Sequence, residues 1–285
     1  MDKEFVEKLA VFVREALQED VGDGDHTTLS TIPAEQQGEA KLLVKEDGIL
    51  AGVEVARKLI EIADPGLKIK TLLTDGTAVK VGDIVLYLEG DIHSILKVER
   101  LVLNVMQRMS GIATRTHEYV SLLEGTKTKV LDTRKTTPLL RFLEKEAVKI
   151  GGGVNHRFGL YDMILIKDNH VDYAGGITKA LTSAESYRQQ LGKEIQIEIE
   201  VRNLKELDEV LAFGSVDRVM LDNFTPQEVK EAVDIIDGRL VTEASGGITI
   251  DTIRAYAEAG VDYISVGALT HSVKSLDLSL KAKLI

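Results

Sequence analysis

The chain has 285 residues, enough for one large domain or two medium ones with a sizeable buried core. It contains no cysteine, which excludes disulfide bonds, thiolate nucleophiles and sulfur-ligated metals and suits a reducing cytoplasm. A formal net charge of −11, with no tryptophan and no basic arm, argues against a nucleic-acid partner. Neither a signal-peptide region nor an apolar run of membrane-spanning length is present. We therefore expect a cytoplasmic protein that binds neither membranes nor nucleic acids.

The first part of the chain predicts a helix, several short strands and a second, longer helix. Apolar residues recur at helical spacing from Phe5 to Leu17, which predicts an amphipathic opening helix. Short strand-like runs, separated by Asp-Gly and Gly-Asp turns, follow at 42–44, 68–70 and 84–88. Ser94 stands where the N-cap of a helix running to about Leu122 is expected. On this helix one polar stripe recurs at steps of three or four residues, for which a solvated face is the default interpretation. It consists of Arg100, Asn104, Arg108, Gly111 and Arg115.

From residue 128 onward, strand-like runs alternate with helical segments. The helical segments carry start signals, since Asn203 and Thr225 each stand three residues before a glutamate, as N-caps do. The predicted strands are 129–131, 163–166, 195–199, 218–221, 240–242 and 263–266. Alternation of this kind predicts a parallel sheet, either a barrel or a doubly wound sheet.

The residues at the ends of these strands favour the barrel. They are Asp132, Lys167, Glu200, Asp222, Glu243 and Gly267. In an α/β barrel the carboxyl ends of the strands converge on one face, which carries the catalytic residues. Six strands are clear rather than eight, so we expect the barrel to be incomplete.

Cationic side chains are concentrated between residues 132 and 170. They are Arg134, Lys135, His156, Arg157, Lys167 and His170. Each of them taken singly could equally be a solvated loop charge in a salt bridge. As a set in an acidic chain, they predict a site for a small, multiply anionic ligand, because Arg forks and Lys ammonium groups match carboxylate and phosphate oxygens.

Two glycine-containing turns follow the last predicted strands. The first is Ser245-Gly246-Gly247, and the second is Ser265-Val266-Gly267. Glycine lets backbone N–H groups approach an anion closely, and phosphate sites after the last strands of a barrel are recurrent. We therefore expect these turns to bind phosphate.

The motifs of this chain, taken together, resemble those of the quinolinate phosphoribosyltransferase family. The most specific combination is Asp-Thr-Arg-Lys-Thr-Thr from Asp132, Asn-His-Arg from Asn155, and Lys-Asp-Asn-His from Lys167. The matching segments span nearly the whole chain in order: 19–28, 99–104, 110–114, 132–141, 151–170, 198–201, 221–223, 243–248 and 265–271.

This resemblance implies a fold, a reaction and an assembly. The implied fold is an N-terminal α/β sandwich, residues 1–114, to which the tail 272–285 can return, followed by an open α/β barrel of about seven strands, residues 115–271. The implied reaction joins quinolinate to phosphoribosyl pyrophosphate with Mg²⁺, giving nicotinate mononucleotide, pyrophosphate and CO₂. The implied assembly is a homodimer at minimum, with each site completed by Arg100 of the neighbouring subunit.

Roles for individual residues follow from the charges of these substrates. Quinolinate is a dicarboxylate, which requires convergent cations, and we assign these to Arg134, His156, Arg157, Lys167 and the neighbour's Arg100. Lys135 and Lys167 are expected at the phosphates and the leaving group. Glu200 and Asp222 suit ribose hydroxyls or Mg²⁺ with most of its waters retained. The remaining predicted substrate contacts are Thr133, Ser245, Gly246, Gly247, Ser265, Val266 and Gly267. Of all these, Lys135, Lys167, Glu200 and Asp222 are the predicted catalytic residues.

Several alternatives stay open beside this hypothesis. Lys167 could form a Schiff base, as in barrel aldolases, although an aldolase would not need the surrounding Arg and His residues. His156 and His170 lack the spacing of a zinc site. His26 is expected to be a turn residue rather than a catalyst. A related phosphoribosyltransferase that uses another base, such as nicotinate, and a non-catalytic metabolite-binding protein on the same scaffold are the alternative functions.

Overall fold

The computed structural model describes residues 1–283 and divides into two compact units. The first unit comprises Met1–Arg115, Pro138–Gly151 and the C-terminal segment from Val273, and the second comprises Thr116–Thr137 and Gly152–Ser272. The expected boundary after residue 114 places segment 138–151 in the barrel domain. In the structure this segment belongs to the first unit, because the Phe142 ring packs edge-on against Phe5 and Phe12 at centroid distances of 5.1 and 6.1 Å.

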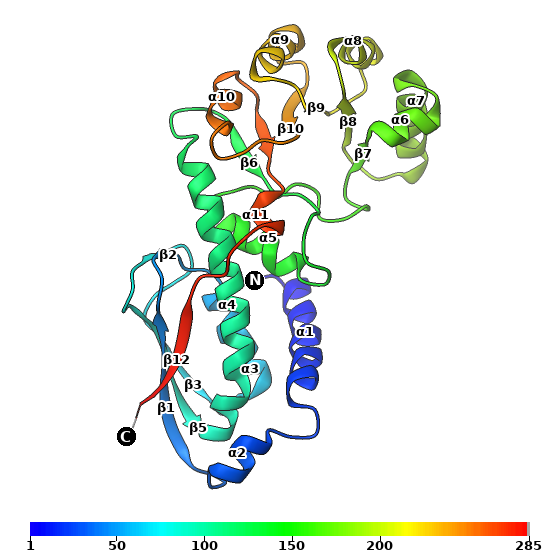
Figure 1. Cartoon of the computed structure of the whole chain (residues 1–285). Helices are drawn as coiled ribbons and strands as arrows, with labels where there is room; N and C mark the ends of the chain where they lie inside the picture. The colour runs from blue at the N-terminus through cyan, green and yellow to red at the C-terminus, as the bar shows by residue number, and fades with distance from the viewer. Residues whose placement is uncertain (284–285) are drawn as a thin grey trace. The chain divides into compact units, whose positions relative to one another are not determined.

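The first unit is built on a four-stranded antiparallel sheet in the order β12-β1-β5-β3 (Figure 1). Its strands are β1 (Gln37–Val44), β3 (Lys68–Thr71), β5 (Ile84–Asp91) and β12 (Leu278–Lys283), with a small ribbon of β2 (Gly48–Ile49) and β4 (Ala78–Val79). Its helices are α1 (Lys3–Val21), α2 (His26–Thr31), α3 (Val53–Ala63), α5 (Arg141–Ile150) and most of α4 (Ile92–Ser121). Every second residue of β1 is buried, so one face of the sheet forms the core with the helices. The C-terminal segment returns to this sheet, where Leu278 pairs with Val44.

Local hydrogen bonds explain where these helices differ from the sequence-based expectation. Helix α4 begins at Ile92 rather than after Ser94, because the Asp91 carboxylate accepts the Ser94 N–H at 2.8 Å. His26 is the first residue of α2 instead of a turn residue, since Asp25 caps that helix by accepting the Thr28 N–H at 3.0 Å. Helix α3 lies in a stretch whose short apolar runs predict only strands.

The expected polar stripe on α4 is solvated only in part. Arg100 is exposed, but the Arg108 Nη2 donates to the buried Glu144 carboxylate at 2.9 Å. The hydroxyl of Ser110 accepts the Ala51 N–H at 2.9 Å, so this polar residue binds the chain after β2. Gly111 gives room for the backbone of Lys274, which passes directly over it. The middle of the stripe is therefore a packing surface.

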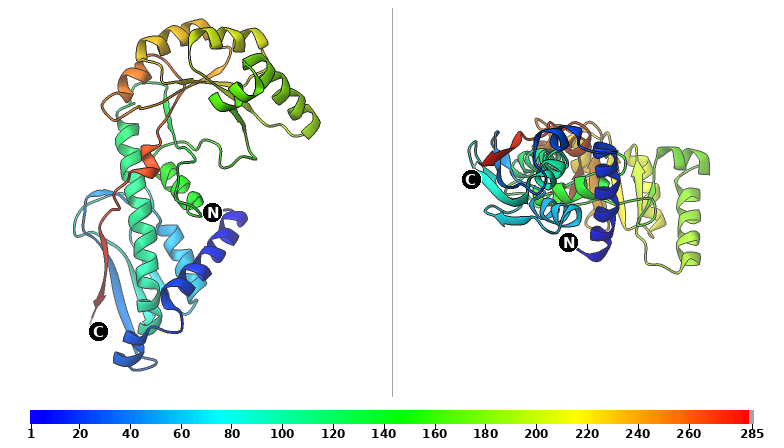
Figure 2. Two further views of the ribbon diagram at one scale, coloured as in Figure 1. Left: turned by 45° about the vertical axis from the view of Figure 1, so that its right-hand side comes forward. Right: turned by 90° about the horizontal axis from the view of Figure 1, so that it is seen from below.

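The second unit contains a six-stranded parallel sheet in the order β6-β11-β10-β9-β8-β7, with helices along its outer side (Figure 2). The strands are β6 (Lys129–Leu131), β7 (Ile164–Ile166), β8 (Ile197–Val201), β9 (Arg218–Asp222), β10 (Val241–Ser245) and β11 (Tyr263–Ser265). The helices are α6 (Asp168–Ala174), α7 (Ile177–Leu191), α8 (Leu204–Phe213), α9 (Pro226–Ile236), α10 (Ile253–Glu258) and α11 (Ala268–His271). Asn203 and Thr225 cap α8 and α9 as predicted.

This sheet is an incomplete barrel, as the sequence predicts. Val154 forms a single parallel bridge to Leu131 on the free side of β6, where a seventh strand would lie. Among the described residues the sheet does not close, because no ladder joins Val154 to β7. Strand β8 ends two residues later than predicted and β10 ends three residues later, so Glu200 and Glu243 lie within strands rather than beyond them. Within the described part of the chain, no helix has the length and apolarity that crossing a membrane requires.

The contact of α4 with the returning C-terminal segment gives a test of packing in the first unit. A methyl group on Gly111 would overlap the carbonyl oxygen of Lys274 and lie 3.1 Å from its carbonyl carbon. Alanine is the better helix former by about 1 kcal/mol. Overpacking costs about 1–3 kcal/mol, and a contact this close with backbone atoms belongs in the upper part of that range. We expect Gly111→Ala to lower the free energy of unfolding by about 1–2 kcal/mol in urea titration. Lys97→Ala, at an exposed position of the same helix, is the control and should stay within about 0.5 kcal/mol. A Gly111→Ala protein as stable as the wild type would contradict this packing.

Candidate active site

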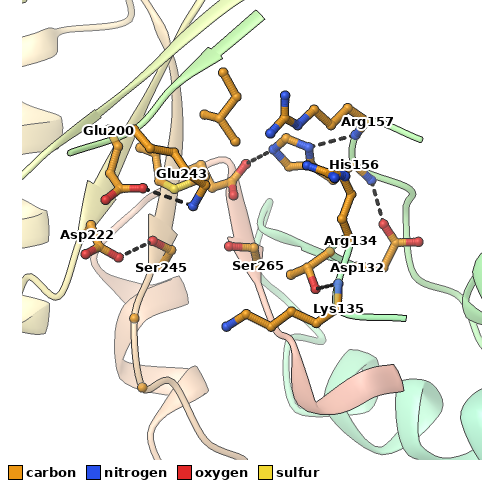
Figure 3. Close-up of a pocket in the computed structure, with 16 residues that line it drawn as sticks. Asp132, Arg134, Lys135, His156, Arg157, Glu200, Asp222, Glu243, Ser245 and Ser265 are labelled. Atoms are coloured by element: carbon orange, nitrogen blue, oxygen red, sulfur yellow. Dashed lines mark hydrogen bonds and ion pairs between the residues drawn. The ribbon is translucent and has the colours of Figure 1, made fainter. Parts of the chain in front are cut away.

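A cavity of about 420 Å³ opens at the carboxyl ends of the parallel strands in the second unit (Figure 3). It is lined by Asp132, Thr133, Arg134, Lys135, His156, Arg157, Leu165, Lys167, Glu200, Met220, Asp222, Glu243, Ser245, Gly246, Gly247 and Ser265. All of these residues belong to the second unit. The strand-end face therefore carries the cluster of ionisable residues that the sequence predicts there.

The structure brings together most of the predicted site residues and leaves three outside the lining. Val266 is 2% exposed, and its N–H donates to the Leu131 carbonyl at 3.0 Å. Gly267 lies under Lys135, where a Cβ atom would be 3.1 Å from the Lys135 Cδ. Arg100 is an exposed residue of α4 in the first unit and does not line this cavity. His170, the sixth cation of the cluster, caps α6 by accepting the Lys167 N–H at 2.9 Å.

Two guanidinium groups make one side of the cavity an anion site. The Nε of Arg134 is buried and has no hydrogen-bond partner among the described residues. Burial, and next the charge of Arg134, lower the pKa of Arg157. Like charges held this close in a partly buried place are unfavourable until an anion binds between them. A bidentate anion such as a carboxylate would relieve this repulsion.

Two carboxylates lie on the other side of the cavity. The Lys167 Nζ donates to Glu200 Oε2 at 3.3 Å, and the Ser245 hydroxyl donates to Asp222 Oδ1 at 2.8 Å. Burial raises the pKa of Glu200, and the charge of Asp222 adds to the rise, whereas Lys167 opposes it. The Lys167 Nζ is held in an ion pair with Glu200, whereas a Schiff-base nucleophile needs its amine available to the substrate. The cavity thus has the two guanidinium groups on one wall, and on the other two carboxylates, one of which is paired with Lys167.

The Ser-Gly-Gly turn after β10 needs glycine at one position for a steric reason. Gly246 has φ +93°, and a Cβ atom there would overlap the Asn223 side chain and lie 2.7 Å from its backbone nitrogen. A Cβ atom on Gly247, at φ +61°, would meet no atom within 4 Å. The first glycine therefore permits the close approach of two loops, and the second leaves space beside the cavity.

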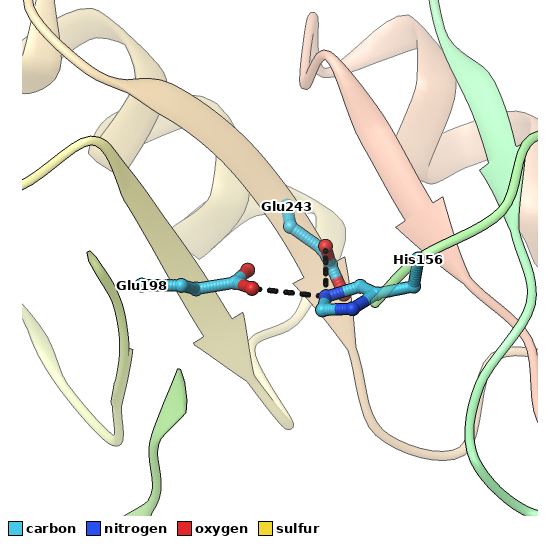
Figure 4. A group of neighbouring side chains, drawn as sticks. All are labelled: His156, Glu198 and Glu243. Atoms are coloured by element: carbon cyan, nitrogen blue, oxygen red, sulfur yellow. Dashed lines mark ion pairs between the residues drawn. The ribbon is translucent and has the colours of Figure 1, made fainter. Parts of the chain in front are cut away.

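Beneath the cavity lies a buried cluster of ionisable groups, formed by His156, Glu198 and Glu243 (Figure 4) together with Arg218. The His156 Nε2 is 2.9 Å from Glu198 Oε2 and 3.3 Å from Glu243 Oε2. The His156 ring is thus in ion-pair contact with both carboxylates. Arg218 Nη1 donates to Glu243 Oε2 at 3.2 Å. Both carboxylates are fully buried.

The members of this buried cluster differ in how tightly they hold a proton. Burial acts to raise the pKa of Glu243, but the contact with His156 lowers it overall. Burial raises the pKa of Glu198 to about 7, and the charge of Glu243 adds to the rise. Burial lowers the pKa of His156, but Glu198 and Glu243 outweigh that effect and raise it to about 9. The His156 Nδ1 accepts the Arg157 N–H at 2.7 Å, so the ring carries its own proton on Nε2. The further proton that the cluster binds is therefore carried on the carboxylate side, by Glu198, and the titration belongs to the cluster as a whole.

Glu198 and Arg218 are the members of this cluster whose importance the sequence analysis does not predict. Glu198 stands two residues before Glu200 on a strand, so both side chains point to the same face. Arg218 and Glu198 are register partners on neighbouring strands. Once Glu200 is known to face the inside of the barrel, Glu198 must face the same way, because it lies two residues earlier on the same strand. A charged residue on the inward face of a buried strand is the signal that could have identified it.

The described residues contain one group of three side chains whose potential ligand atoms all lie within 4.8 Å of one another: His156, Glu198 and Glu243. This group already contacts the Arg218 guanidinium, which does not suit a bound cation. Glu200 and Asp222 at the cavity are the better oxygen donors for Mg²⁺. Since they are only two residues, they fit an ion that keeps most of its water or substrate ligands.

The fold and the cavity together define an open α/β-barrel enzyme with an anion-binding site at its strand ends. Comparison with known proteins identifies the family. The model of the quinolinate phosphoribosyl transferase N-terminal domain matches residues 25–110, and the model of the C-terminal domain matches residues 112–281. The chain belongs to the quinolinate phosphoribosyltransferase family and is therefore a pentosyltransferase.

The relatives extend over nearly the whole chain. Quinolinate phosphoribosyltransferase [decarboxylating] 1b of Nicotiana tabacum is 47% identical over 281 residues, covering 93% of this chain and 80% of that protein. The probable nicotinate-nucleotide pyrophosphorylase [carboxylating] of Bacillus subtilis (strain 168) is 44% identical over 266 residues, covering 93% and 90%. The solved structure of the nicotinate-nucleotide pyrophosphorylase from Francisella tularensis has a TM-score of 0.90 at 41% identity, covering 98% and 97%.

The proton taken up by the cluster of His156, Glu198 and Glu243 predicts how stability depends on pH. The folded state binds this proton more tightly than the unfolded chain does, so its contribution is complete below the ordinary pKa of 6.5 and is lost as pH rises to about 9. We expect the free energy of unfolding to fall over this range by up to about 3 kcal/mol. Urea titrations at several pH values measure this change. His156→Gln removes the titrating group and should flatten the curve, whereas a wild-type stability that rises over this range would exclude the tight proton.

Proposed function

We propose that this cavity is the active site in which quinolinate is joined to phosphoribosyl pyrophosphate, giving nicotinate mononucleotide, pyrophosphate and CO₂. The observation that carries the proposal is the pair of guanidinium groups, Arg134 and Arg157, which repel each other across a site otherwise suited to a dicarboxylate. Lysine ammonium groups and a glycine-containing turn beside the same cavity suit phosphate oxygens. This reaction is a step of de novo NAD synthesis.

The reaction needs positioning and charge stabilisation more than a protein nucleophile. The ring nitrogen of quinolinate forms a bond to the anomeric carbon of the ribose, and pyrophosphate leaves with the electron pair of the broken C–O bond. The carboxylate next to the ring nitrogen then leaves as CO₂, because the positive nitrogen stabilises the carbanion, which takes up a proton from water. An oxocarbenium-like transition state of this kind is favoured by fixed charges that need no reorganisation.

Each wall of the cavity has a role in this scheme. Arg134 and Arg157 bind the quinolinate carboxylates. Lys135 and Lys167 bind phosphate oxygens and stabilise the departing pyrophosphate, and Thr133 holds Lys135 by accepting its N–H at 3.0 Å. Glu200 and Asp222 accept hydrogen bonds from the ribose hydroxyls. Ser245, Gly246, Gly247 and Ser265, with the backbone near Val266 and Gly267, line the phosphate side.

Mg²⁺ is part of the proposal as a companion of phosphoribosyl pyrophosphate. When bound, it would neutralise part of the pyrophosphate charge, with Glu200 and Asp222 as its nearest protein carboxylates. The protein's own contribution is to hold the Lys167 ammonium beside Glu200. When the substrate binds, a phosphate oxygen replaces the Glu200 carboxylate as the partner of Lys167.

A homodimer with a shared site and a cytoplasmic location complete the proposal, and higher assembly remains compatible with it. The exposed Arg100 on α4 is the cation that we assign to the neighbouring subunit's site. The lack of cysteine suits a reducing compartment.

The choice of base tests the proposed reaction and its alternatives. The wild-type protein should release pyrophosphate with quinolinate but not with nicotinate, because the loss of one carboxylate leaves a guanidinium unpaired. An unpaired buried charge costs about 2–5 kcal/mol, which is several decades in kcat/KM. The assay contains phosphoribosyl pyrophosphate, Mg²⁺ and either base. Comparable turnover of both bases would favour the nicotinate alternative, and binding without pyrophosphate release would favour a non-catalytic protein.

Mixed dimers test the shared site. Arg100→Ala and Arg134→Ala chains, each inactive alone, would be unfolded and refolded together. With a shared site, half of the randomly formed dimers carry one site free of both changes, so about a quarter of wild-type activity should return. Native mass spectrometry confirms that mixed dimers form. If each site is built from a single chain, every site keeps one change and no activity returns.

A further inference from the structure

We propose that His156 is a positioning residue for Arg157 and not a ligand of the substrate. This inference rests on the proposed function, which it deepens by separating the residues that touch quinolinate from a residue that holds one of them. The sequence analysis assigns His156 to the cations that bind the quinolinate carboxylates. The proposal replaces that role with one of positioning Arg157.

Both ring nitrogens of His156 are directed at the protein. The Nδ1 accepts the Arg157 N–H at 2.7 Å, and the Nε2 faces Glu198 and Glu243 at 2.9 and 3.3 Å. Figure 3 shows the ring between Glu243 and the backbone of Arg157. To bind a substrate carboxylate, one nitrogen would have to leave these partners. Turning the ring away would leave two fully buried carboxylates without their histidine, which is strongly unfavourable.

The backbone before Arg157 is held by side chains at two successive residues. The fully buried Asp132, which follows β6, accepts the His156 N–H at 2.9 Å. His156 in turn accepts the N–H of Arg157 through its ring. These two hydrogen bonds fix the direction in which the Arg157 side chain leaves the loop.

Arg157 needs such support because its neighbour repels it. Its Nη1 donates to the Met163 carbonyl at 3.3 Å, and its charge lies close enough to Arg134 for each to disfavour the other. A guanidinium in this position would swing away unless its backbone were fixed. Small displacements of a substrate-binding group weaken both binding and reaction.

The support for His156 extends into the sheet. Arg218 Nη1 holds Glu243 at 3.2 Å, and the Arg218 Cζ lies 4.7 Å from the centroid of the Tyr263 ring. Contacts thus run from β9 and β11 through Glu243 on β10 to the His156 ring, and from there to the backbone of Arg157. The position of the Arg157 guanidinium therefore depends on the strands of the sheet.

A double-mutant cycle between His156 and Arg157 tests the proposal. Asparagine at position 156 can place an acceptor oxygen near the Nδ1 position, whereas glutamine places its amide near Nε2. We expect His156→Gln to raise the Kd for quinolinate about tenfold more than His156→Asn does. In an Arg157→Ala background the two substitutions should differ by less than about twofold, because the residue through which they act is gone. The Kd for phosphoribosyl pyrophosphate should change less than about threefold throughout.

Two other results would overturn the proposal. If His156 binds quinolinate itself, both substitutions lose its charge and weaken quinolinate binding equally, and their effects multiply with that of Arg157→Ala. If His156 only supports the fold, the urea midpoint and both substrate affinities decline together. Turnover of quinolinate by the wild-type protein is measured in the same series. If the wild type does not turn over quinolinate, the proposed function is wrong; if it does and the double-mutant cycle shows no coupling, only the positioning role of His156 is wrong.

A measurement on the wild-type protein decides the question if the His156 variants do not fold. Protein labelled with ¹⁵N-histidine gives separate ring-nitrogen resonances, assigned by comparison with the other five histidines replaced in turn. A positioning role predicts that the Nδ1 resonance of His156 is that of an unprotonated acceptor with and without quinolinate. Protonation of Nδ1 on binding quinolinate would show that His156 contacts the carboxylate and would refute the proposal.

Discussion

Two fully buried carboxylates, Glu198 and Glu243, determine how the interior of the barrel is built. Burying an unpaired carboxylate is too unfavourable for a fold to sustain, so the charges have to be balanced where they stand. Arg218 and His156 supply that balance from a neighbouring strand and from the loop before β7. Barrel interiors are usually filled with branched apolar side chains, whereas this one has an ionic layer directly beneath its cavity. The layer that holds the fold together is therefore also the floor of the site.

The cavity above this floor has its charges sorted by the elements that carry them. The two guanidinium groups and Lys135 come from the loops after β6 and before β7, Lys167 follows β7, and Glu200 and Asp222 come from the ends of β8 and β9. Because each group is fixed by its own strand or loop, the electric field of the site exists before any ligand enters. A preorganised field of this kind is the largest contribution that proteins make to reactions in which charge moves between two substrates. Such a field requires like charges to be held close together without a ligand, and the repulsion between Arg134 and Arg157 is an example.

Sequence reasoning reaches the parts of this structure that depend on local patterns. Strand-end position places Lys167 and Asp222 at the cavity, and the Ser-Gly-Gly pattern places the turn after β10. It does not reach Arg218, whose pairing with Glu243 depends on the register between two neighbouring strands, β9 and β10. Nor does it predict that segment 138–151 belongs to the first unit, because that depends on the meeting of three aromatic rings. Local patterns indicate which residues face inward, and only the folded chain shows which of them meet.

The return of the chain to the first sheet has a consequence for synthesis on the ribosome. Strand β12 pairs with β1 along its length, although more than 230 residues separate Leu278 from Val44. While the second unit is being made, one edge of β1 is unpaired and can join the edge of another chain. The first unit is thus the last to be completed, even though all of its helices except α5, and three strands of its four-stranded sheet, are made first. Nascent chains of this protein present an open strand edge for most of their synthesis, and this is the stage at which a chaperone has most to protect.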